Sequence, residues 1–137
     1  MKAGVEIDVR ASNCDVYLAH DPFTPGPTLA EWLQYYRHGT IIVNVKEDGL
    51  EERVCEILHA HGAHKFFFLD QPLPTLIKSM KTNNIPNAIR YSKYEPALLT
   101  SLLPRNDGDW IWVDVFDNAL PSLNSSNVIK NTKSIGY

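Results

Sequence analysis

The chain lacks the features typical of membrane-spanning, secreted and nucleic-acid-binding proteins. Among its 137 residues are two cysteines, Cys14 and Cys55, which are too few for a disulfide framework. No apolar run approaches the ~20 residues that a spanning helix needs, and the opening residues MKAGVEIDVR lack the apolar stretch of a signal peptide. A net charge of −3 provides no basic stripe for nucleic-acid phosphates. These absences predict a soluble, cytoplasmic protein with no membrane span and no nucleic-acid partner.

What the chain does have is the composition of one globular domain, with 44% hydrophobic and 21% charged residues. Short β-branched and aromatic runs alternate with stretches of helical spacing, and Cys14–His20 reads as an extra hairpin strand. Alternation of this kind predicts the α/β class, a parallel sheet with helices packed outside it, either rolled into a barrel or left open. The expected strands are Val5–Val9, Thr40–Val45, Lys65–Leu69, Asn87–Tyr91 and Trp110–Phe116, with a further one beginning in Ser134–Tyr137. The expected helices lie around Leu29–Tyr36, Leu50–Leu58, Leu73–Met80 and Leu98–Leu102.

Local signals mark the ends of two of these helices. Thr28 followed by Glu31 forms a capping box before the first helix, and Gly62 is placed to end the second. Three histidines also fall near the end of the second helix, where they interact favourably with the helix dipole. We therefore interpret His59, His61 and His64 as helix-end residues in preference to a metal cluster.

Every expected strand ends in polar residues. Strand side chains alternate with period two, so Glu6, Asp8 and Arg10 share one face of the first strand. In parallel α/β proteins the ligand site lies at the carboxyl ends of the strands, so the clustering predicts a site there. The other strand-end residues are Asn44, Lys46, Asp70, Arg90, Ser92, Trp112 and Asp114.

These residue types suit a phosphate ester. Arg10, Lys46 and Arg90 are cations that could hold an anionic phosphate. Glu6 and Asp8 could hold a divalent cation or a hydroxyl-bearing substrate. His20 supplies an imidazole, the side-chain type suited to proton transfer to an alkoxide leaving group.

Three runs, GVEIDVR, YLAHDPF and IIVNVK, resemble the superfamily of glycerophosphodiester phosphodiesterases and phosphatidylinositol-specific phospholipases C. These TIM-barrel enzymes share an E-x-D strand, an H-D pair soon after it and an acid-x-Lys strand. The resemblance implies a phosphoric diester hydrolase of lipid metabolism that acts on a glycerol- or inositol-type phosphodiester. It further implies the following roles: catalytic His20, Arg10 and Lys46, and metal-binding Glu6, Asp8 and Asn44, holding Mg²⁺ or Ca²⁺ weakly. From their places at the strand ends, Arg90, Trp112 and Asp114 are expected to bind the substrate.

The sequence departs from this family pattern in two places. The family's first catalytic histidine lies on a strand before E-x-D, yet only three residues precede Gly4 here. Asn44 replaces the third metal-binding acid, which weakens any cation site. The run Asp8-Val9-Arg10 also resembles the D-x-R of the metal-independent phospholipase branch, in which arginine takes the place of the cation.

Length adds a further expectation. A complete barrel has about eight βα units in ~250 residues, whereas this chain holds five, with the start of a sixth. We therefore expect residues 1–137 to be one domain, a fragment of a longer phosphodiesterase-like TIM barrel with five to six strands. Its open sheet edges would favour self-association.

Two other functions remain open. One is a catalytically inactive relative that binds a phosphate or sugar phosphate. The other is a flavodoxin-like receiver domain, with Asp70 and Ser92 at strand ends, although Asp114 stands where a receiver has lysine. Strand order separates the folds, because a barrel arc keeps sequential neighbours and the receiver order is 2-1-3-4-5.

Overall fold

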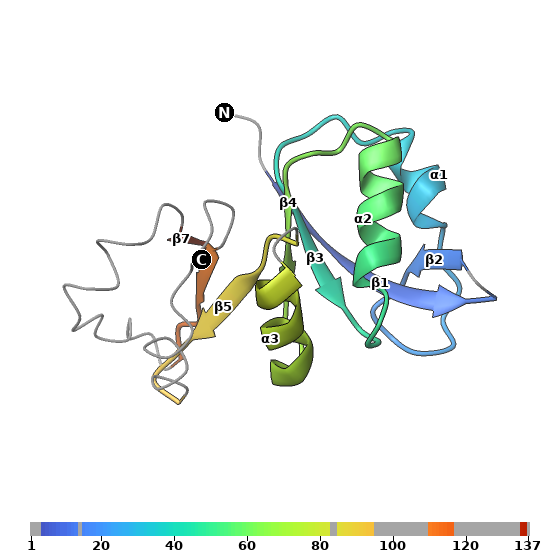
Figure 1. Ribbon diagram of the computed structural model, residues 1–137. Coiled ribbons are helices and arrows are strands. Elements are labelled where there is room, and N and C mark those ends of the chain that lie inside the picture. The colour runs from blue at the N-terminus through green and yellow to red at the C-terminus, as the bar shows by residue number, and fades with distance from the viewer. Residues whose placement is uncertain (1–3, 14, 83–84, 95–109, 117–134, 137) are drawn as a thin grey trace.

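The helices and strands alternate along the chain, as the sequence predicts (Figure 1). The computed structural model describes residues 4–13, 15–82, 85–94, 110–116 and 135–136. The fourth expected helix, around Leu98–Leu102, lies outside the described residues, as does Cys14. The elements are β1 (Val5–Ser12), β2 (Asp15–Leu18), α1 (Leu29–Leu33), β3 (Ile41–Val45), α2 (Glu51–Ala60), β4 (Phe66–Leu69), α3 (Leu73–Thr82), β5 (Ala88–Tyr91), β6 (Trp110–Val113) and β7 (Ile135–Gly136).

The strands form two sheets that meet between β4 and β5. The first sheet has the order β2-β1-β3-β4, with β1, β3 and β4 parallel and β2 antiparallel to β1, which confirms the extra hairpin strand. The second sheet has the order β5-β6-β7 and is parallel throughout. A parallel bridge between Phe68 and Asn87 joins the two. The α/β class is therefore confirmed, and the described strands do not close into a barrel.

The main hydrophobic core lies between the first sheet and the helices α1 and α2. Ile7 and Val9 alternate with the polar residues of β1, and Val9 and Val43 are fully buried. This pattern follows from the period-two alternation of a strand that is covered on one side. The helices contribute Leu29, Leu33, Val54, Ile57 and Leu58, and β3 and β4 add Ile41, Val45, Phe66 and Phe68.

The opposite face of the sheets carries a smaller apolar cluster. Phe67, Leu69 and Ala88 are buried there, with Trp110 and Trp112 packed beside them. The rings of Phe67 and Trp110 stack with their centroids 4.5 Å apart. This aromatic layer spans both sheets and supports the polar residues at the strand ends.

Helix ends agree with the sequence signals. Thr28 Oγ1 accepts a hydrogen bond from the Glu31 backbone at 3.1 Å, and the Thr28 backbone donates to Glu31 Oε2 at 2.9 Å, which completes the capping box. Gly62, with φ of +72°, follows α2 in the left-handed conformation that glycine favours. Helix α1 ends at Leu33, short of the expected Tyr36, and the Arg37 side chain donates to the backbone carbonyls of both residues. Among the described helices, none combines the length and apolarity needed to cross a bilayer.

Candidate functional site

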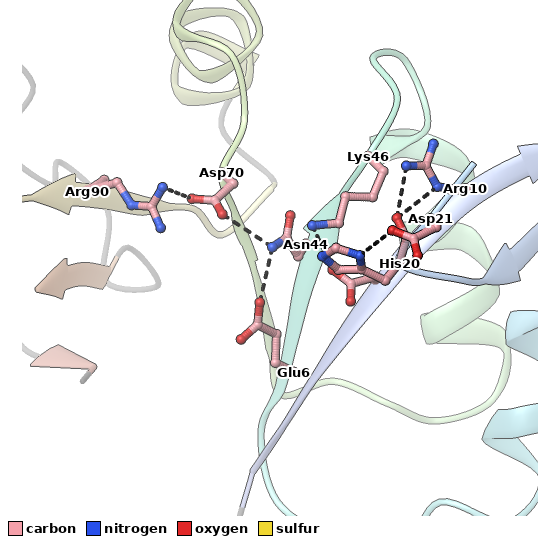
Figure 2. Close-up of polar contacts among 9 residues, drawn as sticks. Glu6, Arg10, His20, Asp21, Asn44, Lys46, Asp70 and Arg90 are labelled. Atoms are coloured by element: carbon pink, nitrogen blue, oxygen red, sulfur yellow. Dashed lines mark hydrogen bonds and ion pairs between the residues drawn. The ribbon is translucent and has the colours of Figure 1, made fainter. Parts of the chain in front are cut away.

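Polar side chains gather at the carboxyl ends of the parallel strands, on the face opposite α1 and α2. Glu6, Asp8 and Arg10 alternate with the buried residues of β1, so they point away from the main core. Asn44 pairs in register with Asp8 on the neighbouring strand. The residues fall into two sets of contacts, which Figure 2 shows side by side.

The first set is a chain of polar contacts from β1 to β6, which we call the carboxylate–arginine cluster. Asn44 Nδ2 donates to Glu6 Oε1 at 3.1 Å and to Asp70 Oδ2 at 3.2 Å. Arg90 Nη1 lies 2.8 Å from Asp70 Oδ1, and its Nε forms an ion pair with Asp114. The cluster therefore links both sheets through Arg90, whose two carboxylate partners come from different strands.

Asp70 reaches this cluster because of an unusual backbone conformation. Phe66 and Phe68 of β4 pack against the helices, and Asp70 is the next residue in the same alternating series. Period two therefore predicts that the Asp70 side chain points to the helix side of the sheet, away from the cluster. The Asp70 φ of +61° is left-handed, a conformation that aspartate adopts more readily than most residues. The turn breaks the alternation and directs the carboxyl towards Asn44 and Arg90.

Burial raises the pKa of the Asp70 carboxyl above its usual value. Arg90 and Lys46 act in the opposite direction, and the carboxylates of Asp114 and Glu6 raise the pKa further. The buried Oδ1 of Asp70 has no aligned hydrogen bond in the described structure, so its contact with Arg90 is electrostatic. Desolvation and like charge therefore outweigh the ion pair.

The second set, which we call the basic cluster, consists of Asp8, Arg10, His20 and Lys46. Lys46 Nζ lies 2.8 Å from Asp8 Oδ1, and about a quarter of each side chain is exposed. Arg10 Nε and Nη2 donate to the His20 carbonyl at 3.2 and 2.9 Å, and Nη1 lies 3.4 Å from Glu47 Oε1. Two cations and the histidine-bearing loop thus meet at the end of β1.

The His20 side chain is open to solvent and has one carboxylate partner. Its Nδ1 lies 2.8 Å from Asp21 Oδ1, and 74% of the side chain is exposed. The Asp21 carboxylate therefore favours one orientation of the His20 ring.

The structure thus distributes the predicted site residues over two clusters on one face. Arg10, His20 and Lys46 lie together with Asp8, whereas Glu6, Asn44, Arg90 and Asp114 form the other cluster. Trp112 joins the carboxylate–arginine cluster through its Nε1, which donates to Asp114 Oδ1 at 3.1 Å. That all of them line a single cavity stays a prediction.

The described donor atoms do not fit a divalent cation in this arrangement. Lys46 places its ammonium against Asp8, and Asn44 presents its amide nitrogen, not its oxygen, to Glu6. A Mg²⁺ or Ca²⁺ site needs several oxygen ligands directed at one point. In the described part of the chain, no three histidine, cysteine or acidic residues are grouped as metal ligands.

The histidines near the end of α2 have local contacts. The His61 ring Nδ1 lies 2.8 Å from the Ile57 carbonyl, within the last turn of the helix. The His59 ring stacks on His64 with centroids 5.7 Å apart and lies 5.4 Å from the Phe66 ring. These contacts agree with a helix-end role.

Three site residues were not assigned a role from the sequence. Asp70 bridges Asn44 and Arg90, Glu47 pairs with Arg10, and Asp21 orients His20. The position of Asp70 directly after an apolar run marks a strand end, but period two points it away from the site. Asp21 belongs to the H-D pair itself, whereas no sequence signal indicates Glu47.

Comparisons of the chain with protein-family models, curated proteins and solved structures give no match. The geometry of the two clusters is therefore the basis for a functional assignment.

Proposed function

We propose that this protein is a phosphoric diester hydrolase-like protein whose basic cluster binds a glycerol- or inositol-type phosphodiester. The observation that carries the proposal is that Arg10 holds the backbone carbonyl of His20, while Lys46 pairs with Asp8 two residues before Arg10 on β1. An arginine, a lysine and a histidine held near one another in this way would supply the two functions that phosphodiester cleavage needs, which are charge stabilisation and proton transfer. The resemblance of the same three runs to the phosphodiesterase superfamily supports this interpretation.

We further propose that the fold is an arc of a TIM barrel. The described parallel strands pair in chain order, β1 with β3 and β3 with β4. A receiver-type sheet would instead place the first parallel strand between the second and third. In the proposed arc the helices lie outside and the open sheet edges favour self-association.

In the proposed mechanism, the phosphate binds to Arg10 and Lys46. Arg10 is positioned for this by its hydrogen bonds to the His20 carbonyl, and Lys46 exchanges part of its contact with Asp8 for the incoming anion. A water molecule or a neighbouring hydroxyl of the substrate attacks the phosphorus and releases its proton to solvent. As the bond from phosphorus to the departing alcohol breaks, His20 protonates the oxygen of that alcohol, and until then its neighbour Asp21 stabilises the charged ring. The cations stabilise the pentavalent transition state, so this route needs no divalent ion.

The second candidate is a relative that binds phosphodiesters without cleaving them. In the family pattern one histidine deprotonates the attacking oxygen and a second protonates the leaving group. His20 matches one of the pair, and this candidate requires that the protein has no residue in the place of the other. In this case the basic cluster still binds the phosphodiester, and the rate of its cleavage stays at the uncatalysed level.

Binding and hydrolysis of glycerophosphoglycerol and of an inositol phosphodiester test the proposal. Lys46→Gln should weaken binding about tenfold or more, because a charge-assisted hydrogen bond contributes roughly 1.5–3 kcal/mol. Lys65→Gln is the matched control, since Lys65 is exposed outside both clusters. If turnover is present, His20→Ala should lower kcat by roughly 10²–10⁴-fold and leave Kd unchanged, whereas His64→Ala should change neither.

The outcomes separate the candidates. Hydrolysis that depends on His20 supports an enzyme, and Lys46-dependent binding without hydrolysis supports the binding relative. If the wild-type protein neither binds nor cleaves either ester, or if the Lys65→Gln control weakens binding as much as Lys46→Gln, the phosphodiester assignment is wrong.

A further inference from the structure

A hollow beside the basic cluster has no role in the contacts described above. It has a volume of about 830 Å³, within the ~300–1,000 Å³ range of small-molecule sites. Its walls come from the end of β1, from β2 and from the loop that carries His20. The lining residues used below are Tyr17, Pro22, Phe23, Pro25 and Glu47.

The loop that forms one wall is held firmly in place. Leu18 donates its backbone N–H to the Pro27 carbonyl at 2.9 Å, and Tyr17 forms a backbone bridge with Thr28. Gly26 packs so closely that an added Cβ would lie 1.8 Å from the Leu18 carbonyl oxygen, so a larger residue would displace the loop. With Pro22 and Pro25 in the same loop, the wall is stiff.

Phe23 is the unexplained residue of this loop. Its side chain is 100% exposed, although an aromatic ring gains stability by burial. Its φ of +60° is left-handed, a conformation rarely found in a bulky residue and one that concentrates at ligand-binding sites. A strained backbone that presents a bare aromatic ring beside a hollow indicates that a ligand covers the ring.

The hollow adjoins the basic cluster at two places. Glu47 lines the hollow and also pairs with Arg10. His20 precedes Pro22 and Phe23 in the same loop, and its carbonyl is held by Arg10. A group attached to a phosphate at the basic cluster would therefore extend into the hollow on the His20 side.

We propose that this hollow binds the alcohol portion of the phosphodiester that departs when His20 donates its proton, and that it selects an alcohol with a large apolar body. The inference rests on the proposed phosphodiester site and adds a specificity to it. Tyr17 and Phe23 contribute aromatic surface to the lining, and Pro22 and Pro25 contribute apolar surface. An alcohol of one or two carbons is too small to contact either ring.

Two phosphodiester probes test the inference, dimethyl phosphate and methyl 1-naphthyl phosphate, each titrated against the full chain. The naphthyl ester should bind about tenfold more tightly, since partial burial of an aromatic group contributes on the order of 1.4 kcal/mol. Phe23→Ala should remove most of this difference and leave dimethyl phosphate binding unchanged. Tyr35→Ala is the matched control, because Tyr35 is an aromatic residue that is 83% exposed outside the hollow.

Amide chemical-shift changes locate the bound group. The naphthyl ester should shift residues of β2 and the loop from Pro22 to Gly26, and dimethyl phosphate should shift those near Lys46 alone. Equal affinities for both probes, or an unchanged preference in Phe23→Ala, would overturn the inference while the phosphodiester site stands. If neither probe binds, the proposed function fails and the inference fails with it.

Discussion

The Asp8–Lys46 pair distinguishes two kinds of phosphate site, one in which a metal ion holds the phosphate and one in which the Lys46 ammonium holds it. Lys46 Nζ lies 2.8 Å from Asp8 Oδ1, so a phosphate that binds Lys46 meets the Asp8 carboxylate as a like charge. If Asp8 is instead a metal ligand, its carboxylate attracts the cation that holds the phosphate. The substitution Asp8→Asn removes the charge and keeps the size of the side chain, so the sign of its effect distinguishes the two sites.

The expected size of the effect follows from Coulomb's law. Two unit charges about 4 Å apart repel by roughly 1 kcal/mol in water and roughly 4 kcal/mol at the effective dielectric of a protein surface. Asp8 and Lys46 are 27% and 21% exposed, which places the pair nearer the protein value before solvent screening is considered. Solvent screening and the loss of the Asp8 partner of Lys46 both reduce the effect. We therefore expect Asp8→Asn to make the free energy of phosphate binding more favourable by about 1–2 kcal/mol, or about five- to thirtyfold tighter binding.

Isothermal titration of dimethyl phosphate in the presence of EDTA, at low and at physiological salt, measures this change. Glu56→Gln is the control for net charge, because it removes a carboxylate on the exposed Arg53–Glu56 pair of α2. Asp8→Asn should bind more tightly than the wild type, and Glu56→Gln should match the wild type. Weaker binding by Asp8→Asn, or wild-type binding that requires added Mg²⁺ or Ca²⁺, would refute the site in which Lys46 holds the phosphate. Either result would support a site in which a metal ion holds it.

Three other predictions concern single residues. Thr28→Ala should lower the free energy of unfolding by about 1 kcal/mol in urea titrations at neutral pH, because it removes the capping box; the Glu31 pKa is lowered by its bonds to Thr28, so the effect should diminish as pH falls through that pKa. Burial raises the pKa of the Cys55 thiol from 9.0 to about 11. In a Cys14→Ser background, Cys55 should therefore react with iodoacetamide about 100-fold more slowly at pH 8 than an ordinary thiol. A rate equal to that of an ordinary thiol would show that Cys55 is not buried as described. Because the Asp70 pKa is raised, the native state binds the carboxyl proton more tightly than the unfolded chain does. The stability of the wild type relative to Asp70→Asn should therefore fall as pH rises from the usual pKa of 3.8 through the raised value. A stability of the wild type relative to Asp70→Asn that rises with pH would contradict the raised pKa.

Period-two and helical spacing predict most of the described elements because local packing decides them. The buried Ile7 and Val9 face the helices and the intervening polar residues face away, as the alternation in β1 requires. The Thr28–Glu31 capping box and the Gly62 helix end depend on nearest neighbours, which makes both visible in the sequence. The alternation also places Glu6 and Arg10 correctly, but it contains no information on which partner each side chain selects.

Asp70 shows where such prediction ends. Alternation assigns it to the helix side of β4, and one left-handed residue reverses that assignment. The reversed Asp70 side chain contacts Asn44 and Arg90, which are 26 and 20 residues away in the chain. Pairings over such separations depend on strand order and register, and neither is encoded in the local pattern.

The two clusters differ in charge, and we expect this difference to orient a bound phosphodiester. The carboxylate–arginine cluster holds three carboxylates, those of Glu6, Asp70 and Asp114, against the single guanidinium of Arg90. Arg90 was expected to bind phosphate, yet both of its anionic neighbours already compensate its charge. We therefore expect this cluster to repel a phosphate, whereas carboxylates accept hydrogen bonds from hydroxyl groups. In the basic cluster, Arg10 and Lys46 each face one carboxylate, and the proposed mechanism has them exchange part of that contact for the phosphate. A phosphodiester would therefore place its phosphate at the end of β1 and a hydroxyl-bearing alcohol towards Asp70 and Asp114, which leaves the other alcohol for the hollow beside Phe23.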